Sequence, residues 1–407
     1  MPRKHVRRAA AALLAVVFAL LCFGAVQAAE PVPPDPGPAA PRIGVATMLP
    51  GEIFFERFGH NAIVVAYPGA EPVSYNFGIF DPGEPDFVGR FVRGDMVYRL
   101  AELPWREDLG YYLQTGRGVN IQWLDLAPAQ ADGMARALAE NALPQNARYR
   151  YDYFTDNCAT RVRDAVDRAL GGALRTQLSA RSRGNTYRSE AVRLARPAWW
   201  MRWGFDVGLG PAADTPMSRW EEAYVPMRLA EGLREARLPD GRPLVAAEEQ
   251  VAPHRIAPEP REQAFPLWPW VLGGLGLAIA WLLLRARRPR TAMAVAGPFW
   301  LIAGLLGATM LFLWLGTEHR FAWANRNLLL LPPTAWLLLP GAWRGLRGLT
   351  PGTVFRAVLW VQAAAAVAAL FVYWLSLVPQ ANAHWIALLL PLHLALLTSA
   401  RRTATPP

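Results

Sequence analysis

Five long apolar runs in the C-terminal third of this 407-residue chain restrict its fold more than any other feature. An apolar segment of roughly 20 residues is long enough to cross a bilayer as a helix. The third run is short and is interrupted by Pro332 and Pro333, and the last is also short. The sequence therefore predicts an all-α transmembrane domain of about five helices over residues 265–400. The runs are Phe265–Leu284, Ala292–Leu315, about Asn327–Trp343, Ala357–Val378 and about His384–Ala400.

The basic residues of this part lie on one side of the predicted spans. If the chain before Phe265 is outside, nine arginines near the span ends fall on the cytoplasmic side, as the positive-inside rule expects. Together with four basic residues near the N-terminus they more than account for the net charge of +10. The rest of the chain is near neutral, so the high pI gives no indication of nucleic-acid binding. The nine are Arg285, Arg287, Arg288, Arg290, Arg344, Arg347, Arg356, Arg401 and Arg402.

Residues 1–29 have the pattern of a secretory signal peptide. A basic segment is followed by an apolar stretch, Ala9–Gly24, and by small residues at the cleavage spacing. An uncleaved anchor is the alternative, and Leu21 before Cys22 argues against lipidation. Residues 30–41 contain six prolines and are predicted to be an extended linker. We expect a multi-pass protein of the bacterial inner membrane, with residues 42–231 in the periplasm and 401–407 in the cytoplasm.

The exported domain, residues 42–231, shows strand patterns first and helix patterns later, which predicts an α+β fold. Residues 59–67 and 72–80 are short apolar and aromatic runs separated by a Pro-Gly turn, which predicts a hairpin. Residues 91–100 and 118–124 are further predicted strands, and residues 128–141 are a predicted helix. Residues 232–264 mix proline with both charge signs and show no apolar period. We interpret them as a flexible linker to the membrane domain.

Cys158 is the only cysteine outside the signal segment, so it cannot form an intramolecular disulfide. The residues after it have a helical apolar stripe, and Asp156 or Asn157 precedes it as a helix cap. The first turn of a helix favours an anion, which lowers a thiol pKa. Its N–H groups are also suited to stabilise an oxyanion. Cys158 is therefore a candidate nucleophile, and a packed structural cysteine is the alternative.

His60 is the only histidine in the predicted exported domain, where it begins the first strand of the hairpin. A thiolate nucleophile commonly needs a histidine as base or ion-pair partner. His60 and Cys158 are therefore the only pair of these types that the domain offers. An unrelated strand histidine is the other interpretation, and spacing alone does not choose between the two.

Several segments resemble the Lnb N-terminal periplasmic domain family, over roughly residues 42–230. The family is named for a lipoprotein N-acyltransferase of Bacteroides. Residues 325–329 also resemble the membrane part of some members, with lower specificity. The matching segments are RFGHNA at 57–62, YNFG at 75–78, FVRG at 91–94, YRL at 98–100 and YDYFTDNC at 151–158, followed less specifically by 206–210 and 224–226.

The order of a strand histidine followed by Asn-Cys at a helix start is similar to permuted papain-like thiol acyltransferases. The resemblance implies a permuted papain-like exported domain, with Cys158 as nucleophile and His60 as base. Asn76 is the candidate that orients the histidine, because it shares a strand face with Ser74 and not with its direct neighbours. Asp156 and Asn157 either shape the site or bind substrate, or they only cap the helix.

Three functions are compatible with these residues. The resemblance favours a membrane-anchored acyltransferase that moves an acyl chain from a phospholipid or lipoprotein ester to an amine, such as a lipoprotein N-terminus. A papain-like amidase or endopeptidase acting on cell-wall peptides is the second. A non-catalytic domain that binds lipid or a partner is the third. None of the three requires a metal or cofactor, and we expect none; membrane phospholipid and lipoproteins are the expected partners.

Overall fold

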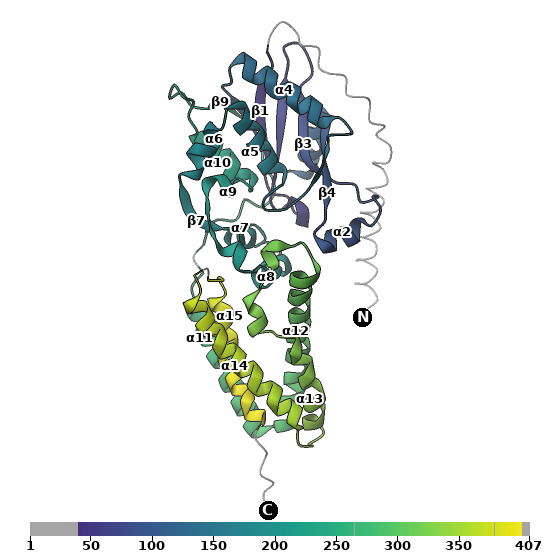
Figure 1. Cartoon of the computed structure of the whole chain (residues 1–407), viewed down its shortest axis with the longest axis vertical. Helices are drawn as coiled ribbons and strands as arrows, with labels where there is room; N and C mark the ends of the chain where they lie inside the picture. The colour runs from purple at the N-terminus through teal and green to yellow at the C-terminus, as the bar shows by residue number, and fades with distance from the viewer. Residues whose placement is uncertain (1–39, 264, 378, 401–407) are drawn as a thin grey trace, which may run out of the picture.

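The computed structural model describes residues 40–263, 265–377 and 379–400. The predicted signal peptide, all but the last two residues of the proline-rich linker, and the C-terminal tail 401–407 lie outside the described residues. Figure 1 shows two parts stacked along the long axis, a domain built on a sheet and a bundle of helices. The N-terminal part is a β-rich α+β domain and the C-terminal part is helical, as the sequence predicted.

A seven-stranded antiparallel sheet, in the order β6-β4-β3-β2-β1-β5-β9, forms the centre of the N-terminal domain. The predicted hairpin is β2–β3, with Val64 opposite Ser74. β1, which was not among the predicted strands, is an interior strand of the sheet because it pairs with both β2 and β5. The strands are β1 Arg42–Met48, β2 His60–Ala66, β3 Val73–Ile79, β4 Val97–Pro104, β5 Val119–Leu124, β6 Arg148–Arg150 and β9 Val245–Ala252.

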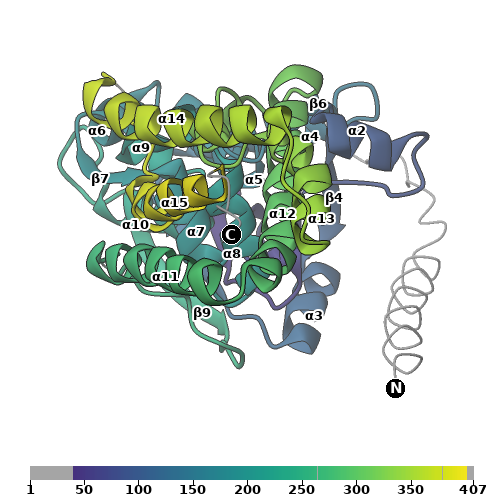
Figure 2. The ribbon, with the colours of Figure 1, turned by 90° about the horizontal axis from the view of Figure 1, so that it is seen from below.

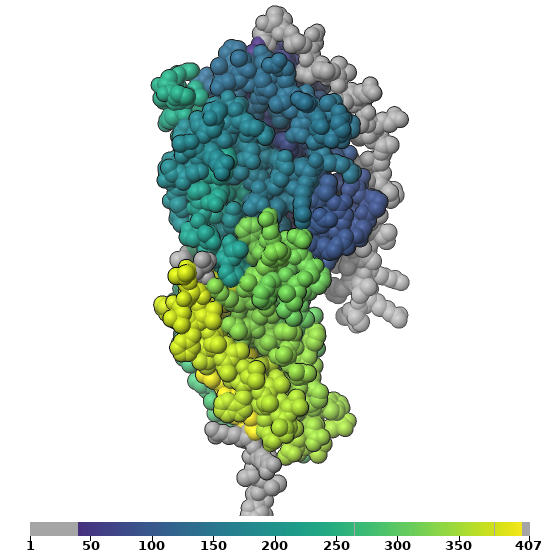
Figure 3. All heavy atoms as spheres, in the orientation of Figure 1, coloured from purple at the N-terminus to yellow at the C-terminus, as the bar shows by residue number. Residues whose placement is uncertain are grey.

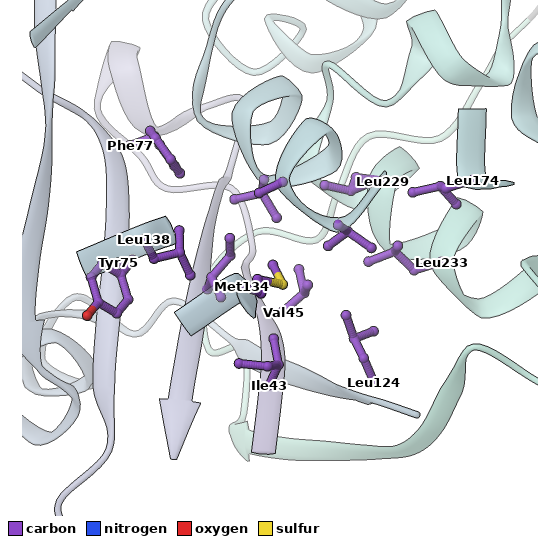
Figure 4. Packing of buried hydrophobic residues seen from close by; sticks show 14 of the residues in the cluster. Ile43, Val45, Tyr75, Phe77, Leu124, Met134, Leu138, Leu174, Leu229 and Leu233 are labelled. Atoms are coloured by element: carbon purple, nitrogen blue, oxygen red, sulfur yellow. The ribbon is translucent and has the colours of Figure 1, made fainter. Parts of the chain in front are cut away.

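Helices cover both faces of this sheet. On one face, sheet residues such as Val45 and Tyr75 pack with Met134 of α4 and Leu229 of α10 in one apolar core (Figure 4). On the other face, Tyr112 of α3 belongs to a separate buried cluster with strand residues. The helices are α2 Phe87–Arg93, α3 Trp105–Thr115, α4 Pro128–Ala142, α5 Cys158–Ala169, α6 Ala173–Ser179, α7 Tyr187–Leu194, α8 Trp199–Gly208, α9 Arg219–Glu222 and α10 Pro226–Glu235; β7 Ser182–Thr186 and β8 Pro216–Ser218 pair beside them.

The predicted strand 91–100 is wrong in its first half. Residues Phe87–Arg93 form α2, and only Val97–Pro104 form β4. Gly94 separates the two with a φ of 74°, a left-handed conformation that ends the helix. The apolar and aromatic residues before Gly94 resemble a strand in composition, and tertiary context made them a helix.

The structure also corrects the interpretation of residues 232–264 as a linker, because most of them belong to the sheet domain. Residues Val245–Ala252 form β9, which pairs with β5 along its length. β9 is an edge strand, and most of its residues are exposed to solvent. Its sequence therefore lacks the alternation of apolar and polar residues that predicts a strand. After β9, the Arg193 guanidinium binds the Glu259 carboxylate at 2.7 Å and the Pro260 carbonyl at 2.6 Å.

Four helices of the C-terminal part are long and apolar enough to cross a membrane. They are α11 Trp268–Arg287, α12 Pro289–Gly316, α14 Thr353–Leu375 and α15 Ala383–Leu396 with its 3₁₀ extension Leu397–Ala400. The predicted third span, 327–343, is not a continuous helix. It consists of 3₁₀ turns at Arg326–Leu329 and Pro333–Leu338, and then α13, Leu339–Leu346.

Proline and glycine explain this irregular segment. Pro332 and Pro333 carry no backbone N–H, so a regular helix cannot run through them. The segment instead lies close against α12, where a Cβ at Gly307 would come within 2.3 Å of the Leu331 carbonyl oxygen. The Trp336 indole donates to the Leu301 carbonyl at 3.1 Å. In the other direction, the His393 imidazole of α15 donates to the Leu330 carbonyl at 2.8 Å, so neighbouring protein satisfies part of the polar backbone that the irregular segment exposes.

The sheet domain is docked on the helical part through buried hydrogen bonds. The Asp206 carboxylate of α8 accepts from the His384 imidazole at 2.7 Å and from the Trp385 indole at 2.9 Å. The Val207 carbonyl accepts from the Asn325 and Asn327 side chains at 2.7 and 3.0 Å. In Figure 3 the end of α12 and the loop after it, in green, lie directly against the sheet domain.

Candidate active site

Cys158 is the first residue of α5, as the sequence predicted. Asn157 is the N-cap: its side-chain oxygen accepts from the Thr160 backbone N–H at 3.0 Å. The Asn157 amide group also donates to the carbonyls of Tyr153 and Tyr224, both at 3.0 Å. Cys158 is a free thiol and is partly exposed. The cap therefore fixes the start of α5 to two neighbouring segments and sets the position of the thiol.

His60 begins β2 and lies between Cys158 and Asn76. The His60 Nε2 atom lies 2.9 Å from the Asn76 Oδ1 atom, so it carries the proton and donates. A hydrogen bond to the thiol of Cys158 contributes to the pKa of His60, and Nδ1 is the ring nitrogen left for it. The prediction that Asn76 shares a face with Ser74 and contacts the histidine agrees with this geometry.

Asp108 of α3 orients Asn76, and the sequence analysis missed it. The Asn76 Nδ2 group donates to Asp108 Oδ2 at 2.9 Å and to Ser74 Oγ at 3.1 Å. The Ser74 hydroxyl donates to the same carboxylate oxygen at 2.7 Å. Because both acceptors face the NH₂ group, Asn76 must present its oxygen to His60. Asp108 is 32 residues from Asn76 on a separate helix, and no local motif marks it.

The electrostatics of the pair favour a thiolate and an imidazolium. Burial raises the pKa of Cys158, but the charge and hydrogen bond of His60 and the backbone N–H groups of Asn61 and Ala159 outweigh it. The pKa of the thiol therefore lies below its usual range. Burial lowers the pKa of His60, but the charge and hydrogen bond of Cys158, with Asn76 and Asp108, raise it above its usual value.

Two tyrosines and a glycine border the thiol. Gly78 has a φ of 92° at an irregularity of β3, and a Cβ built on it would lie 3.7 Å from the Cβ of Cys158. That same position is 3.9 Å from the Tyr149 hydroxyl and 3.9 Å from the Tyr151 ring. The Tyr149 hydroxyl is buried and has no hydrogen-bond partner among the described residues. An unpaired buried donor beside a nucleophile is available to a bound substrate.

The other predicted site residues have structural partners. Asp156 forms a two-point ion pair with Arg161, whose guanidinium lies 4.1 Å from the centre of the Tyr149 ring. Asp156 and Asn157 thus shape the start of α5. Arg163 of the same helix is buried and lies over the Trp220 ring.

Two further histidines belong to this region, and both are bonded to backbone. His254, which the sequence analysis placed in a linker, accepts from the Gly118 N–H at Nδ1 and lies 3.0 Å from the Ala257 carbonyl at Nε2. His319, in the loop after α12, donates to the Val92 carbonyl at 3.2 Å. His60 is therefore the histidine paired with the thiol. Within the described residues no group of His, Cys, Asp and Glu is suited to hold a metal.

Comparison with known proteins gives two matches along the chain. The model of the Lnb N-terminal periplasmic domain matches residues 45–193, and that of the Lnb transmembrane domain matches residues 263–404. No curated protein and no solved structure matches the chain. The two matched regions follow each other in one chain and cover both the sheet domain with its thiol and the membrane helices. The protein therefore belongs to the Lnb family, as a membrane protein with an N-terminal periplasmic domain.

Proposed function

We propose that the protein is a membrane-anchored cysteine acyltransferase. It moves an acyl chain from an ester of a phospholipid or lipoprotein to an amine, such as a lipoprotein N-terminus. The observation that supports this most is the group formed by Cys158, His60 and Asn76 at the head of α5. A thiolate with an adjacent histidine is the usual arrangement for covalent acyl transfer.

The order of the three residues supports a permuted papain-like domain. In papain-like enzymes the cysteine comes first, and the histidine and asparagine follow it in the chain. Here His60 and Asn76 precede Cys158 in the chain, but the contacts have the same order, with the histidine between the cysteine and the asparagine. The thiol lies at a helix start, the histidine on a strand, and the asparagine on the far nitrogen of the imidazole.

In the first step the Cys158 thiolate attacks the carbonyl carbon of the ester. The negative charge moves to the carbonyl oxygen, where the Cys158 backbone N–H and the Tyr149 hydroxyl are candidate donors. The carbon–oxygen bond to the leaving group then breaks, and the His60 imidazolium gives its Nδ1 proton to the departing alcohol. The products are an alcohol and a thioester on Cys158.

In the second step an amine attacks the thioester carbonyl. His60, now neutral, takes a proton from the amine, and the carbon–sulfur bond breaks. The amide leaves, and the thiolate and imidazolium are restored. Asn76 and Asp108 hold the imidazole in one tautomer in both steps.

Amide hydrolysis of a cell-wall peptide would use the same residues with water as the second nucleophile. Attachment to the membrane favours lipid, because the docked membrane domain keeps the thiol at a fixed position relative to the bilayer. We therefore keep the acyltransferase as the proposed function and make hydrolysis an outcome of its test.

The test is mass spectrometry of lipoprotein N-termini from cells with and without the protein. We expect N-acylation to depend on it, and Cys158→Ala and His60→Ala to abolish the difference. Glu140→Ala, on the exposed end of α4, is the matched control and should behave as wild type. If the lipoproteins were unchanged and the cell-wall muropeptides were altered, the amidase would replace the acyltransferase as the proposed function. Full complementation by Cys158→Ala would exclude both enzymes.

A further inference from the structure

The sheet domain has an exposed apolar surface that its own core does not use. It consists of six large side chains on α2 and on the segment around the 3₁₀ turn Phe54–Glu56, and we name it the α2 patch. Monomeric soluble domains rarely leave such a contiguous apolar surface in water. Its members are between 43% and 72% exposed: Ile53, Phe54, Phe55, Val88, Phe91 and Val92.

The α2 patch lies at the level where the membrane helices end. The Glu318 N–H, two residues after the end of α12, donates to the Arg93 carbonyl of α2 at 2.7 Å. His319 donates to the Val92 carbonyl at 3.2 Å. Seen from the membrane side, α2 projects beyond α12 and α13 and is not covered by them (Figure 2). The surface beside α2 is therefore continuous with the outer surface of the helix bundle, whose helices are long and apolar enough to cross a membrane.

A row of aromatic rings joins the α2 patch to the thiol. Tyr151, which borders the same point beside Gly78 as Cys158, stacks on Tyr98 with 4.2 Å between ring centres. Tyr98 lies 5.2 Å from Phe80. Phe80 in turn lies 5.9 Å from Phe55, a member of the patch, and 5.6 Å from Phe87 of α2. A continuous row of ring contacts thus leads from the α2 patch to the tyrosine that borders Cys158.

We propose that the α2 patch is inserted in the leaflet on the side of the sheet domain, and that a phospholipid acyl chain reaches Cys158 along these rings. The acyl-delivery part rests on the proposed function, whereas the insertion does not. The ion pair of Arg93 with Asp86 is exposed beside the patch, where the polar headgroups would lie. The fixed contact with α12 makes lipid, and not a soluble partner, the occupant.

Insertion is tested without any activity. The background is the full-length protein with Cys22→Ser and Cys158→Ala, which has no other cysteine. In this background Val88→Cys is labelled with an environment-sensitive fluorophore, and the protein is placed in vesicles of phosphatidylethanolamine and phosphatidylglycerol. We expect a blue shift and quenching by spin-labelled lipids. Ala137→Cys is an exposed position on α4, which lies at the end of the sheet domain away from the helix bundle (Figure 1), and it should show neither. Equal quenching at both positions, or none at Val88, would overturn the insertion.

Acyl delivery is tested by formation of the thioester on Cys158, measured as intact mass. Val88→Glu should reduce acylation from vesicle phospholipid by about 10-fold or more, since a charge inserted in lipid is costly. Acylation from a soluble short-chain ester should stay within about twofold, because Val88 is 72% exposed and outside the core. Ala137→Glu should change neither reaction. Equal loss with both donors would overturn the delivery route, and no acylation of the wild type by any donor would instead refute the proposed function.

Discussion

Cys158 and His60 each stabilise the charged form of the other. Their reactivity should therefore fall at both low and high pH. The pKa of Cys158 is lowered and that of His60 is raised. As pH falls through the lowered thiol pKa the nucleophile is lost, and as pH rises through the raised imidazole pKa the acid is lost. Acyl transfer should therefore show a bell-shaped profile, whose two limbs belong to the coupled pair.

Alkylation of Cys158 by iodoacetamide reports the thiolate alone and gives the sharper measurement. In the wild type its midpoint should lie below the usual thiol value of about 8.5. His60→Gln removes the charge and leaves burial, which raises the pKa, so the midpoint should move up. Once the midpoint lies above neutral pH, each further unit lowers the thiolate fraction at neutral pH, and with it the alkylation rate, about tenfold. A midpoint that is the same in both proteins would contradict the pairing.

Asp108 is a positioning residue, because it acts on His60 only through Asn76. Asp108→Ala leaves the buried amide of Asn76 with the Ser74 hydroxyl as its remaining acceptor and no longer fixes its orientation, so we expect kcat to fall on the order of 10²-fold with KM nearly unchanged. Asp108→Asn keeps an acceptor and should recover most of kcat. It also removes a charge that raises the pKa of His60, so the alkaline limb should move to lower pH. If Asp108 had only a structural role, the alkaline limb of the pH profile would stay at the same pH in Asp108→Asn.

At the scale of elements, the start of α5 depends on one asparagine. Asn157→Ala removes the cap, worth about 1 kcal/mol, and two further hydrogen bonds to buried segments. We expect a lower melting temperature of the solubilised protein and slower alkylation of Cys158. Asn157→Ser keeps the capping oxygen and loses only the amide donors, so its melting temperature should lie between those of the wild type and Asn157→Ala. If Asn157→Ser melted as low as Asn157→Ala, the cap would contribute nothing.

The elements that local pattern predicted well are those whose burial leaves a signal in consecutive residues. The strands β2 and β3 are short apolar and aromatic runs buried on both faces, and the helices α4 and α5 bury one stripe at the helical period. The errors occur where this rule gives no signal. The edge strand β9 is mostly exposed, α2 leaves its apolar residues in solvent, and the irregular segment after α12 is bonded by side chains of other elements instead of forming its own helix.

At the scale of the molecule, Asp206 couples the two domains. Asp206→Ala leaves the buried His384 donor without its acceptor, at a cost of about 1–3 kcal/mol, and also removes the acceptor of the half-buried Trp385 indole. We expect faster amide hydrogen exchange in α8 and at the start of α15, and unchanged exchange in β1. Glu140→Ala is the control on α4. Unchanged exchange at α8 would mean that the other interface contacts hold the domains without Asp206.

The sequence by itself determined the division into an exported and a membrane domain, the helix start at Cys158 and the pairing of the only candidate thiol with His60. These follow from properties written in consecutive residues: apolar length, charge placement, periodicity and a capping residue. Only the tertiary structure decided that Asp108 orients Asn76, that the Tyr149 hydroxyl beside the thiol has no partner in the described part of the chain, and that α2 lies against the loop after α12. Each of these joins residues far apart in the chain, so no local pattern encodes it.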